Sequence, residues 1–591
     1  MTVLQERPDV EPAVRAQTAT APPAVPADAW VNTSDHKRLG LLFIYAALFF
    51  LVASGLSALV IGAQQASPSL GLAVSRFDRL YGLHSQSGIL LFLTAIWIGL
   101  ATYVVPLQVG AGRLALPRLS AMGFWTYLIG GATLLVSYLT GQVNGLGITQ
   151  SSPLAPIPGG ADSATLLWIV SLGMIAVGFL FASASLLVTV AGLRTDGMTV
   201  LRVPAFSWAT LVASVVTMVA TPVFLGGLVL LGIDQRFGGH LLASTTPGSL
   251  GIWQRALWLY GRPDLYLLTV LALGAASDIV ATHARRPLLE HRVALIMLAL
   301  LGALSLGSWV SNARTTHAVV VPTYTALMAG VVIPLGITVL MWLGTAAKGR
   351  PHFHVSLLFV AGAIGLWVIG AANALGAALH HVDGIGGTSS WIAGNVHTVV
   401  VGPPTLIAVG AIYHWAPKMW GRPLRPAAGG LVALTLFGGF AATGLAYYFL
   451  GYNGVPLGQT ADITSYQKGL YALAEIGGVV VVLGVLILLA DLVMAAGPRR
   501  DTSGTAADDP YQGLTLEWAT SSPPPPWGFD SVPEVRSAAP LYYLRHVADG
   551  MSPGSMSPGS GSPGSGNPGS PGSGSPADAS AAAITARAGR P

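Results

Sequence analysis

The sequence contains no cysteine and few charged residues, and both shortages exclude whole classes of protein. Its 591 residues include no Cys, so disulfides, iron–sulfur clusters, thiolate zinc sites and thioether-linked haem are excluded within this chain. Only 9% of the residues are charged, whereas soluble domains carry about 25%. With a mean hydropathy of +0.64, this deficit predicts a protein whose main solvent is lipid.

Long apolar runs recur from one end of the chain to the other. A hydrocarbon core roughly 30 Å thick needs about 20 apolar residues for a helix to cross it. The runs lie at about 40–63, 82–105, 121–141, 165–192, 208–232, 252–283, 291–311, 318–346, 355–379, 391–416, 426–451 and 469–495. The sequence therefore predicts an all-α integral membrane protein with twelve transmembrane helices.

Lys and Arg are concentrated in alternate loops between these runs. The richer set is Lys37/Arg38, Arg113/Arg118, Arg194/Arg202, Arg285/Arg286/Arg292, Lys348/Arg350, Lys418/Arg422/Arg425 and Arg499/Arg500. The sparser set is Arg76, Arg79, Arg236, Arg255, Arg314 and Lys468. Loops rich in Lys and Arg stay in the cytoplasm, so both termini are predicted there. The pI near 9.4 therefore indicates membrane topology, and no nucleic-acid partner is expected.

Four parts are predicted along the chain. Residues 1–35 form a disordered cytoplasmic tail that lacks the features of a cleaved signal, and residues 36–497 form the membrane domain. Residues 498–545 form a cytoplasmic C-terminal extension. Residues 546–591 form a Ser/Pro/Gly-rich tail that is expected to be disordered, because it has almost nothing apolar to bury.

Two histidines inside the predicted spans are the first candidates for chemistry, because ionisable side chains in a membrane are costly and usually functional. His84 opens the second run and His397 lies early in the tenth. Both runs begin on the outer side, so the two imidazoles lie at similar depth. That position suits the ligation of one haem iron from opposite faces. The alternative is that each is an interfacial histidine bonded to a carbonyl group.

Several segments resemble subunit I of the haem–copper oxidases, and most closely the catalytic subunit of bacterial cytochrome c oxidases. They are residues 34–44, 104–125, 258–266, 391–420 and 513–536, the last of which contains TLEWATSSPPPP. The resemblance runs from about residue 34 to 537. It implies a twelve-helix fold, haem cofactors, the plasma membrane of a bacterium, and partners similar to oxidase subunits II and III.

The resemblance implies that His84 and His397 hold one low-spin haem, of type a or b. Helix ten of the family reads His-x-His, and two residues turn a helix by about 200°, so those imidazoles bind two different haems. This chain reads Asn395-Val396-His397. We therefore expect the low-spin haem to be kept, while Asn395 deprives the oxygen-binding haem of its proximal ligand.

The family's copper ligands are also replaced. Its Gly-His-Pro-Glu motif on helix six matches GRPD at 261–264, with Tyr266 at the position of the family's Tyr, and its paired histidines on helix seven match Ser311 and Asn312. A guanidinium group has no lone pair to offer copper, so no copper is expected. We assign no catalytic residue within this degenerate site, which comprises Arg262, Asp264, Tyr266, Ser311, Asn312 and Asn395.

Other positions point in the same direction. The family's Asp after helix two matches Arg113, and its Lys on helix eight matches Thr338, so both proton-uptake paths are expected to be damaged. His317 is expected in an outer loop and not as a substitute copper ligand.

The sequence thus favours a respiratory-chain subunit that keeps one haem, has lost its oxygen-reduction centre, and serves in electron transfer or complex assembly. Two alternatives stay open. One is an active cytochrome c oxidase subunit that couples oxygen reduction to proton translocation, and the other is a non-catalytic haem sensor or scaffold. An oxidase would show a CO-binding high-spin haem, a carrier only a six-coordinate haem, and a sensor a haem that respiratory donors do not reduce.

Overall fold

A computed structural model describes residues 28–141, 163–237, 249–307, 317–379, 389–459, 462–496 and 508–548, and these residues are mostly helical. Side chains are not described at 249–265 and 317–329. The chain divides into two units, Met1–Leu544 and Arg545–Pro591. Only the first four residues of the second unit, 545–548, are described.

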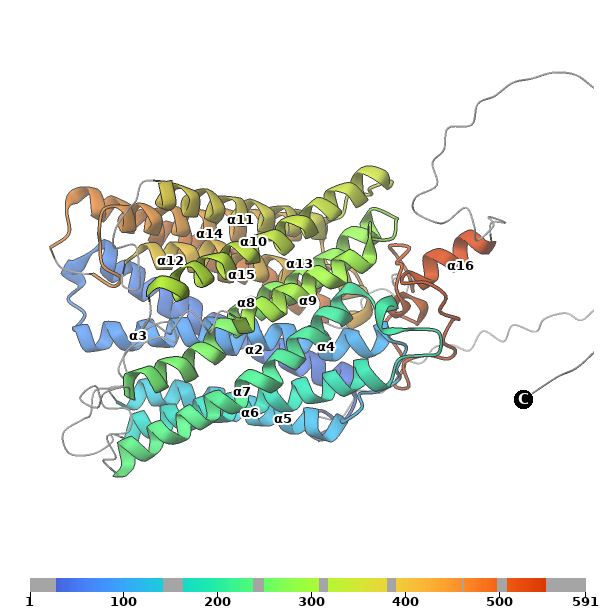
Figure 1. The fold of residues 1–591 in the computed structure, drawn as a ribbon, viewed down its shortest axis with the longest axis horizontal. Coiled ribbons are helices and arrows are strands. Elements are labelled where there is room, and N and C mark those ends of the chain that lie inside the picture. Colours follow the sequence, from blue (N-terminus) through green and yellow to red (C-terminus); the bar gives the residue numbers. More distant parts are fainter. Residues whose placement is uncertain are drawn as a thin grey trace, which may run out of the picture. The chain divides into compact units, whose positions relative to one another are not determined.

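The helices follow one another along the chain with short connections. The first half contains α1 (Asp28–Val31), α2 (His36–Ala66), η1 (Pro68–Leu70), α3 (Val74–Gln86), η2 (Ser87–Thr94), α4 (Ala95–Gln108), α5 (Pro117–Thr140), α6 (Ser163–Gly192), η3 (Val200–Arg202) and α7 (Ala205–Phe237). The second half contains α8 (Ser249–His283), α9 (His291–Gly307), α10 (His317–Lys348), α11 (Val355–Leu379), α12 (Trp391–Asn395), η5 (Val396–Val401), α13 (Gly402–Trp420), α14 (Pro426–Tyr452), α15 (Ser465–Ala496), η6 (Leu516–Ala519) and α16 (Pro540–Ala548). The long helices run side by side along one common direction (Figure 1).

Eleven helical segments of the described chain are long and apolar enough to cross a membrane. A shorter apolar helix, His291–Ser305, lies within α9 and corresponds to the predicted run 291–311. The last residues of that run lie outside the described part of the chain. The all-α membrane fold is therefore confirmed, while the number of twelve spans stays a prediction.

Local sequence signals explain several helix ends. The Asp35 side chain accepts a hydrogen bond from the Lys37 backbone N–H at 3.0 Å and caps the start of α2. Pro117 and Pro426 stand at the first positions of α5 and α14, where a missing N–H costs nothing. Gly421 ends α13 at a φ of 70°, a left-handed conformation that glycine adopts without strain.

Two helices begin earlier than the apolar pattern predicts. The second span starts within α3, at Val74, so His84 does not open it but follows almost three turns later. Arg76 and Arg79, predicted in a loop, are therefore part of the helix. Long Arg side chains can reach from a helix to the membrane surface. Arg76 and Arg79 can therefore lie in the part of α3 that precedes its apolar run. His317, also predicted in a loop, is the first residue of α10.

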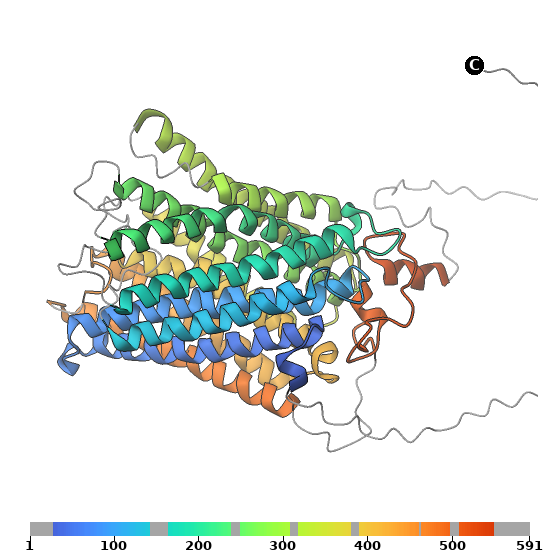
Figure 2. The same cartoon turned by 90° about the horizontal axis from the view of Figure 1, so that it is seen from below.

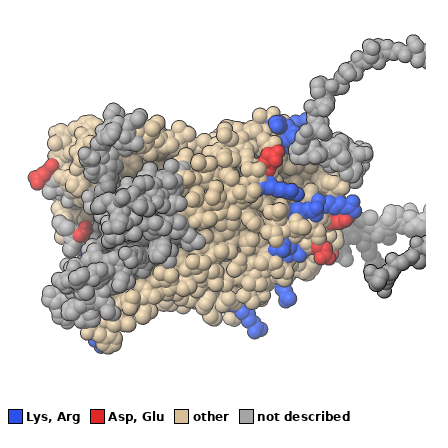
Figure 3. All heavy atoms as spheres, in the orientation of Figure 1, with Lys and Arg blue, Asp and Glu red and all other residues tan. Residues whose placement is uncertain are grey.

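The C-terminal segment 508–544 packs on one end of the bundle, where α2, α4, α8 and α13 also end (Figures 1 and 2). Figure 3 shows most of the visible Lys and Arg side chains near the same end, with few along the middle of the bundle. This distribution fits a helical bundle whose middle faces lipid and whose ends face water.

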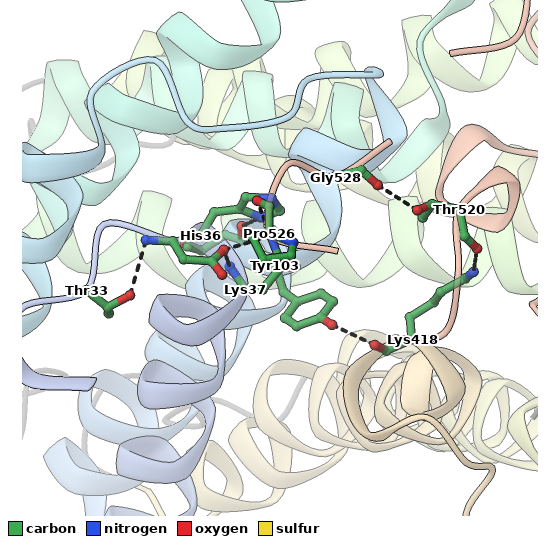
Figure 4. Close-up of polar contacts among 10 residues, drawn as sticks. Thr33, His36, Lys37, Tyr103, Lys418, Thr520, Pro526 and Gly528 are labelled. Atoms are coloured by element: carbon green, nitrogen blue, oxygen red, sulfur yellow. Dashed lines mark hydrogen bonds and ion pairs between the residues drawn. The ribbon is translucent and has the colours of Figure 1, made fainter. Parts of the chain in front are cut away.

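Two lysines of the bundle hold the backbone of this segment (Figure 4). The buried Lys418 ammonium donates to the carbonyl oxygens of Asp508 at 2.7 Å and Thr520 at 2.5 Å. Lys37 donates to the Pro526 carbonyl at 3.1 Å. Charged donors make strong hydrogen bonds to carbonyls, so these contacts fix the C-terminal segment on the bundle. The sequence predicts the same residues as an extension outside the bundle.

Two buried carboxylates also join the segment to the bundle. The Gln108 side-chain amide of α4 donates to Asp278 of α8 at 3.0 Å and to Glu517 at 3.1 Å. Asp278 accepts two more hydrogen bonds from the backbone N–H groups of Ala205 and Phe206, which are the first residues of α7. Burial raises the pKa of the Glu517 carboxyl above its ordinary value. One amide side chain therefore connects three helices and the C-terminal segment.

Replacing Lys418 by methionine should loosen segment 508–530 from the bundle. The change keeps a long unbranched side chain but removes a charged donor, whose hydrogen bonds are worth about 1.5–3 kcal/mol each. We expect faster hydrogen exchange and earlier proteolytic cleavage within 508–530 in the solubilised full-length protein. Lys348→Met, an exposed lysine at the end of α10, is the matched control and should change neither. Equal protection of the segment in both variants would contradict this account.

Candidate functional site

The structure brings together the two histidines that the sequence singles out. His84 comes from α3 and His397 from η5, and their ring centroids lie 6.4 Å apart with the ring planes 15° from parallel. Both imidazoles are half-buried, and the elements that carry them pack on α2 and α14 respectively.

Each imidazole is oriented by a backbone carbonyl group. His84 Nδ1 lies 3.1 Å from the Ser54 carbonyl oxygen, and His397 Nδ1 lies 2.7 Å from the Ala393 carbonyl oxygen. A carbonyl oxygen can only accept, so Nδ1 carries the proton in both rings and Nε2 keeps its lone pair. Histidines that bind metals are typically fixed in this way by a hydrogen bond from their other ring nitrogen.

Both histidines lie at places where the regular α-helix is interrupted. The π-helix η2, Ser87–Thr94, begins three residues after His84, and the π-helix η5, Val396–Val401, contains His397. π-Helical turns are rare and are frequent at functional sites, because they reorient the side chains on one turn relative to the helix before it. The sequence contains no signal that predicts a π-helix at either position.

Close packing against α14 holds the turn that carries His397. A Cβ atom on Gly394 would lie 2.8 Å from the Gly444 carbonyl oxygen, so the two helices touch through their backbones. Tyr447 lies next to His397, with ring centroids 6.0 Å apart and planes 18° from parallel, and Phe440 lies 6.4 Å from it. Aromatic rings therefore shield one side of this imidazole.

These features fit a metal held between two imidazoles. With metal–nitrogen bonds of about 2 Å, as for zinc, ligating nitrogens on opposite sides of one ion lie roughly 4 Å apart. The ring centroids then lie further apart by part of a ring on each side, which is compatible with the observed 6.4 Å. The tautomers fixed by Ser54 and Ala393 present a lone pair on each ring, as axial haem ligands require.

The structure leaves most of the predicted degenerate site undescribed. Arg262 and Asp264 belong to α8, but their side chains lie outside the described residues, as do Ser311 and Asn312 entirely. Tyr266 of α8 and Asn395 at the end of α12 are both half-buried. The assignments made to this site from the sequence therefore stay predictions.

A second group of histidines, which the sequence did not single out, lies at the end of the bundle covered by the C-terminal segment. His283 Nε2 and His414 Nδ1 are 3.2 Å apart, and the rings of His283 and His354 stack at 4.4 Å. Tyr511 packs against His354, 4.6 Å away. Burial, with His352 nearby, lowers the pKa of His354 to about 4, so this imidazole is neutral. Their spacing in the sequence gives no sign of this contact.

This second group does not form a metal site. In the part of the chain that the structure describes, no group of three or more His, Asp or Glu side chains is arranged to hold a metal ion. Neutral stacked imidazoles instead fill the contact between the helix ends and Tyr511.

One cavity of about 40 Å³ lies among α4, α6, α7 and α8. Five hydroxyl side chains line it, namely Thr94, Ser183, Thr210, Ser214 and Thr217, among apolar neighbours. Thr94, Thr210 and Thr217 donate to carbonyls of their own helices, so their hydroxyls require no ligand. A cavity of this size has room for about three water molecules, and we assign it no further role.

The chain is similar to known membrane proteins over most of its length. The family model described as Cytochrome C and Quinol oxidase polypeptide I matches residues 38–485. Cytochrome c oxidase subunit 1 of Corynebacterium glutamicum is 31% identical over 552 residues, covering 92% of this chain and 94% of that protein. A putative cytochrome c oxidase subunit 1-beta of Streptomyces avermitilis is 30% identical over 524 residues, covering 88% and 92%.

The fold is also that of a solved structure. A heme-copper terminal oxidase dimer has a chain that matches with a TM-score of 0.65 at 15% identity, covering 80% of this chain and 86% of that one. At this identity the match shows the shared fold alone.

Replacing either His84 or His397 by alanine should abolish the spectrum of a six-coordinate low-spin haem, because a single remaining imidazole cannot complete the axial coordination. Reduced-minus-oxidised absorption of the purified protein measures this. His414→Ala is the control, since His414 is a buried imidazole seventeen residues further along (414 − 397), or about 25 Å. A low-spin spectrum that survives in either ligand variant would show that the ligand assignment is wrong.

Proposed function

Because the chain belongs to the cytochrome c and quinol oxidase polypeptide I family, we propose that it is a haem-binding membrane subunit of a respiratory chain that transfers electrons through one low-spin haem. The observation that carries this proposal is the facing pair of His84 and His397, each with Nε2 left as a ligand. The role is electron transfer or assembly of the complex.

A bound haem would supply a one-electron carrier that sits between the two rings. The residues of the chain orient and shield the two imidazoles. The Ser54 and Ala393 carbonyls hold the imidazoles in the tautomer that can bind iron. Ser54 also donates from its hydroxyl to the His84 carbonyl at 2.9 Å, which ties α2 to the turn that carries this ligand. Tyr447 and Phe440 exclude water from the side of His397.

The proposal includes the loss of the oxygen-reduction centre. Splitting the O–O bond in this family needs an open iron opposite copper, and imidazole is the ligand suited to copper. The sequence has Asn395 at the position of the proximal iron ligand, and Arg262, Ser311 and Asn312 at the positions of the copper ligands. One such departure could come from a local shift in alignment, but four on three helices, beside family-like residues, favour a real loss.

The arrangement in the cell is part of the proposal. We place the protein in the plasma membrane of a bacterium, with both termini in the cytoplasm and other oxidase subunits, similar to subunits II and III, as partners. The four-part division into residues 1–35, 36–497, 498–545 and 546–591 is kept, with 508–544 now assigned to a cap on the bundle.

Metal and ligand analysis of the purified chain tests the loss of the centre. We expect about one iron and no copper per chain, because two histidines are kept and the copper positions are not histidine. Carbon monoxide should not shift the reduced spectrum, because a bis-histidine haem has no open position. The pyridine haemochrome spectrum gives the haem type and number.

The second candidate is an active cytochrome c oxidase subunit, and the full-length similarity to proteins of that name favours it. Stoichiometric copper that survives washing with chelator, together with a CO-induced spectral shift, would replace our proposal with this one. A haem that artificial reductants reduce but respiratory donors do not would instead support a sensor or scaffold.

Single cysteines test the topology cleanly, because the chain has none of its own. Ser69→Cys lies between α2 and α3, and Arg350→Cys lies between α10 and α11, and both residues are exposed. In intact cells a membrane-impermeant maleimide should label the first, whereas it should label the second only after permeabilisation. The reverse pattern would invert the topology.

A further inference from the structure

One ionisable side chain within the spans near the histidine pair has no role in the function proposed so far. Glu475 lies on α15, ten residues after its start at Ser465, which is about 15 Å along the helix. A carboxyl group at this depth is costly in a membrane and usually has a function. No motif in the sequence marks Glu475, because it lies within an apolar run.

Glu475 and the candidate haem ligand His397 share one neighbour, Tyr447. The Glu475 carboxylate rests on the backbone of Gly62 in α2, where a Cβ atom would collide with it. It is close enough to Tyr447 to interact with it electrostatically. Tyr447 in turn stacks on His397 at 6.0 Å and donates its hydroxyl to the buried Gln65 side chain at 2.8 Å.

In the described part of the chain, no charged side chain is paired with the Glu475 carboxyl group. Gly62 of α2 lies against this carboxyl group and Tyr447 of α14 interacts with it, while Gln65, Tyr81 and Tyr471 lie near Tyr447. In a surrounding of low dielectric constant the neutral acid is favoured, and a nearby positive charge favours the carboxylate.

We propose that Glu475 takes up one proton when the haem held by His84 and His397 is reduced, an inference that rests on the proposed function. Oxidised bis-histidine haem carries one excess positive charge at its centre, which favours the carboxylate. An external one-electron donor, a reduced metalloprotein or a redox mediator, removes that charge, and the carboxylate then binds a proton from water. No bond to iron forms or breaks, and one electron and one proton enter together.

The sign of the pH dependence follows from this coupling. Reduction raises the proton affinity of Glu475, so a lower pH favours reduction and the midpoint potential falls as the pH rises. The slope approaches about 59 mV per pH unit between the proton affinities of the oxidised and the reduced state, since each unit is a tenfold change for one electron. In Glu475→Gln the slope should be near zero, and at high pH its midpoint should exceed that of the unchanged protein.

Redox titration of the low-spin haem in the solubilised full-length protein at several pH values tests the proposal. Asp78→Asn is the matched control, because it makes the same acid-to-amide change at an exposed carboxylate of α3, and it should keep the slope. Glu475→Asp, which retains the carboxyl group, should keep it as well. A slope that persists in Glu475→Gln, or that disappears in Asp78→Asn, would overturn the role of Glu475.

A second measurement does not depend on any variant. The reduced-minus-oxidised infrared difference spectrum of the unchanged protein should show a protonated carboxyl group appearing on reduction. Its absence, together with a midpoint independent of pH, would overturn the role of Glu475 and leave the proposed electron-transfer function intact. A purified protein that contains no haem would overturn both.

Discussion

A bilayer offers no water to polar groups, and this constraint governs the rest of the structure. Every backbone N–H and carbonyl group within the membrane must find its partner in the protein. An α-helix satisfies this requirement within a single segment. Polar side chains obey the same rule. Thr126 and Thr133 on exposed faces of α5, for example, donate to carbonyls one turn back on their own helix. Such residues need no functional explanation.

Some ionisable side chains are not fully satisfied by a carbonyl group of their own helix. His84 and His397 each use Nδ1 in a hydrogen bond to a backbone carbonyl, which leaves the lone pair on Nε2. Asp278 is satisfied by Gln108 and by two N–H groups at the start of α7. Glu475 has only uncharged neighbours among the described residues. Asp278 is thus a structural carboxylate, whereas Glu475 is the carboxylate that we propose takes part in a reaction.

The sequence was sufficient for the helical membrane fold, because apolar runs of about 20 residues have few other structures available. It placed helix starts less well. The apolar run that contains His84 begins near 82, yet α3 begins at Val74, because arginines near a helix end do not stop the helix. The pairing of His84 with His397 was predicted from depth and from the family motif, and the geometry is compatible with it.

Other features had no signal in the sequence. A π-turn differs from an α-turn by one residue, and composition does not record that difference, so η2 and η5 were not predicted. The segment around TLEWATSS looked like a polar extension, because the lysine that binds it, Lys418, lies about a hundred residues earlier in the chain. Hydrophobic periodicity does not reveal long-range contacts between polar groups, and such contacts position this segment.

The geometry of one helix explains how a chain can lose one metal centre and keep another. Asn395 ends α12, and the hydrogen bond from His397 in η5 reaches the Ala393 carbonyl without involving the Asn395 side chain. The packing of Gly394 against Gly444 likewise does not involve the Asn395 side chain. If Arg262 occupies the position of a copper ligand, as proposed, its permanent positive charge would replace the charge of the metal ion. The proposed loss of the centre would therefore leave the helix that carries the remaining ligand undisturbed. In our proposal, the site of His84 and His397 and the nearby Glu475 carboxyl group then operate together and take up one electron and one proton.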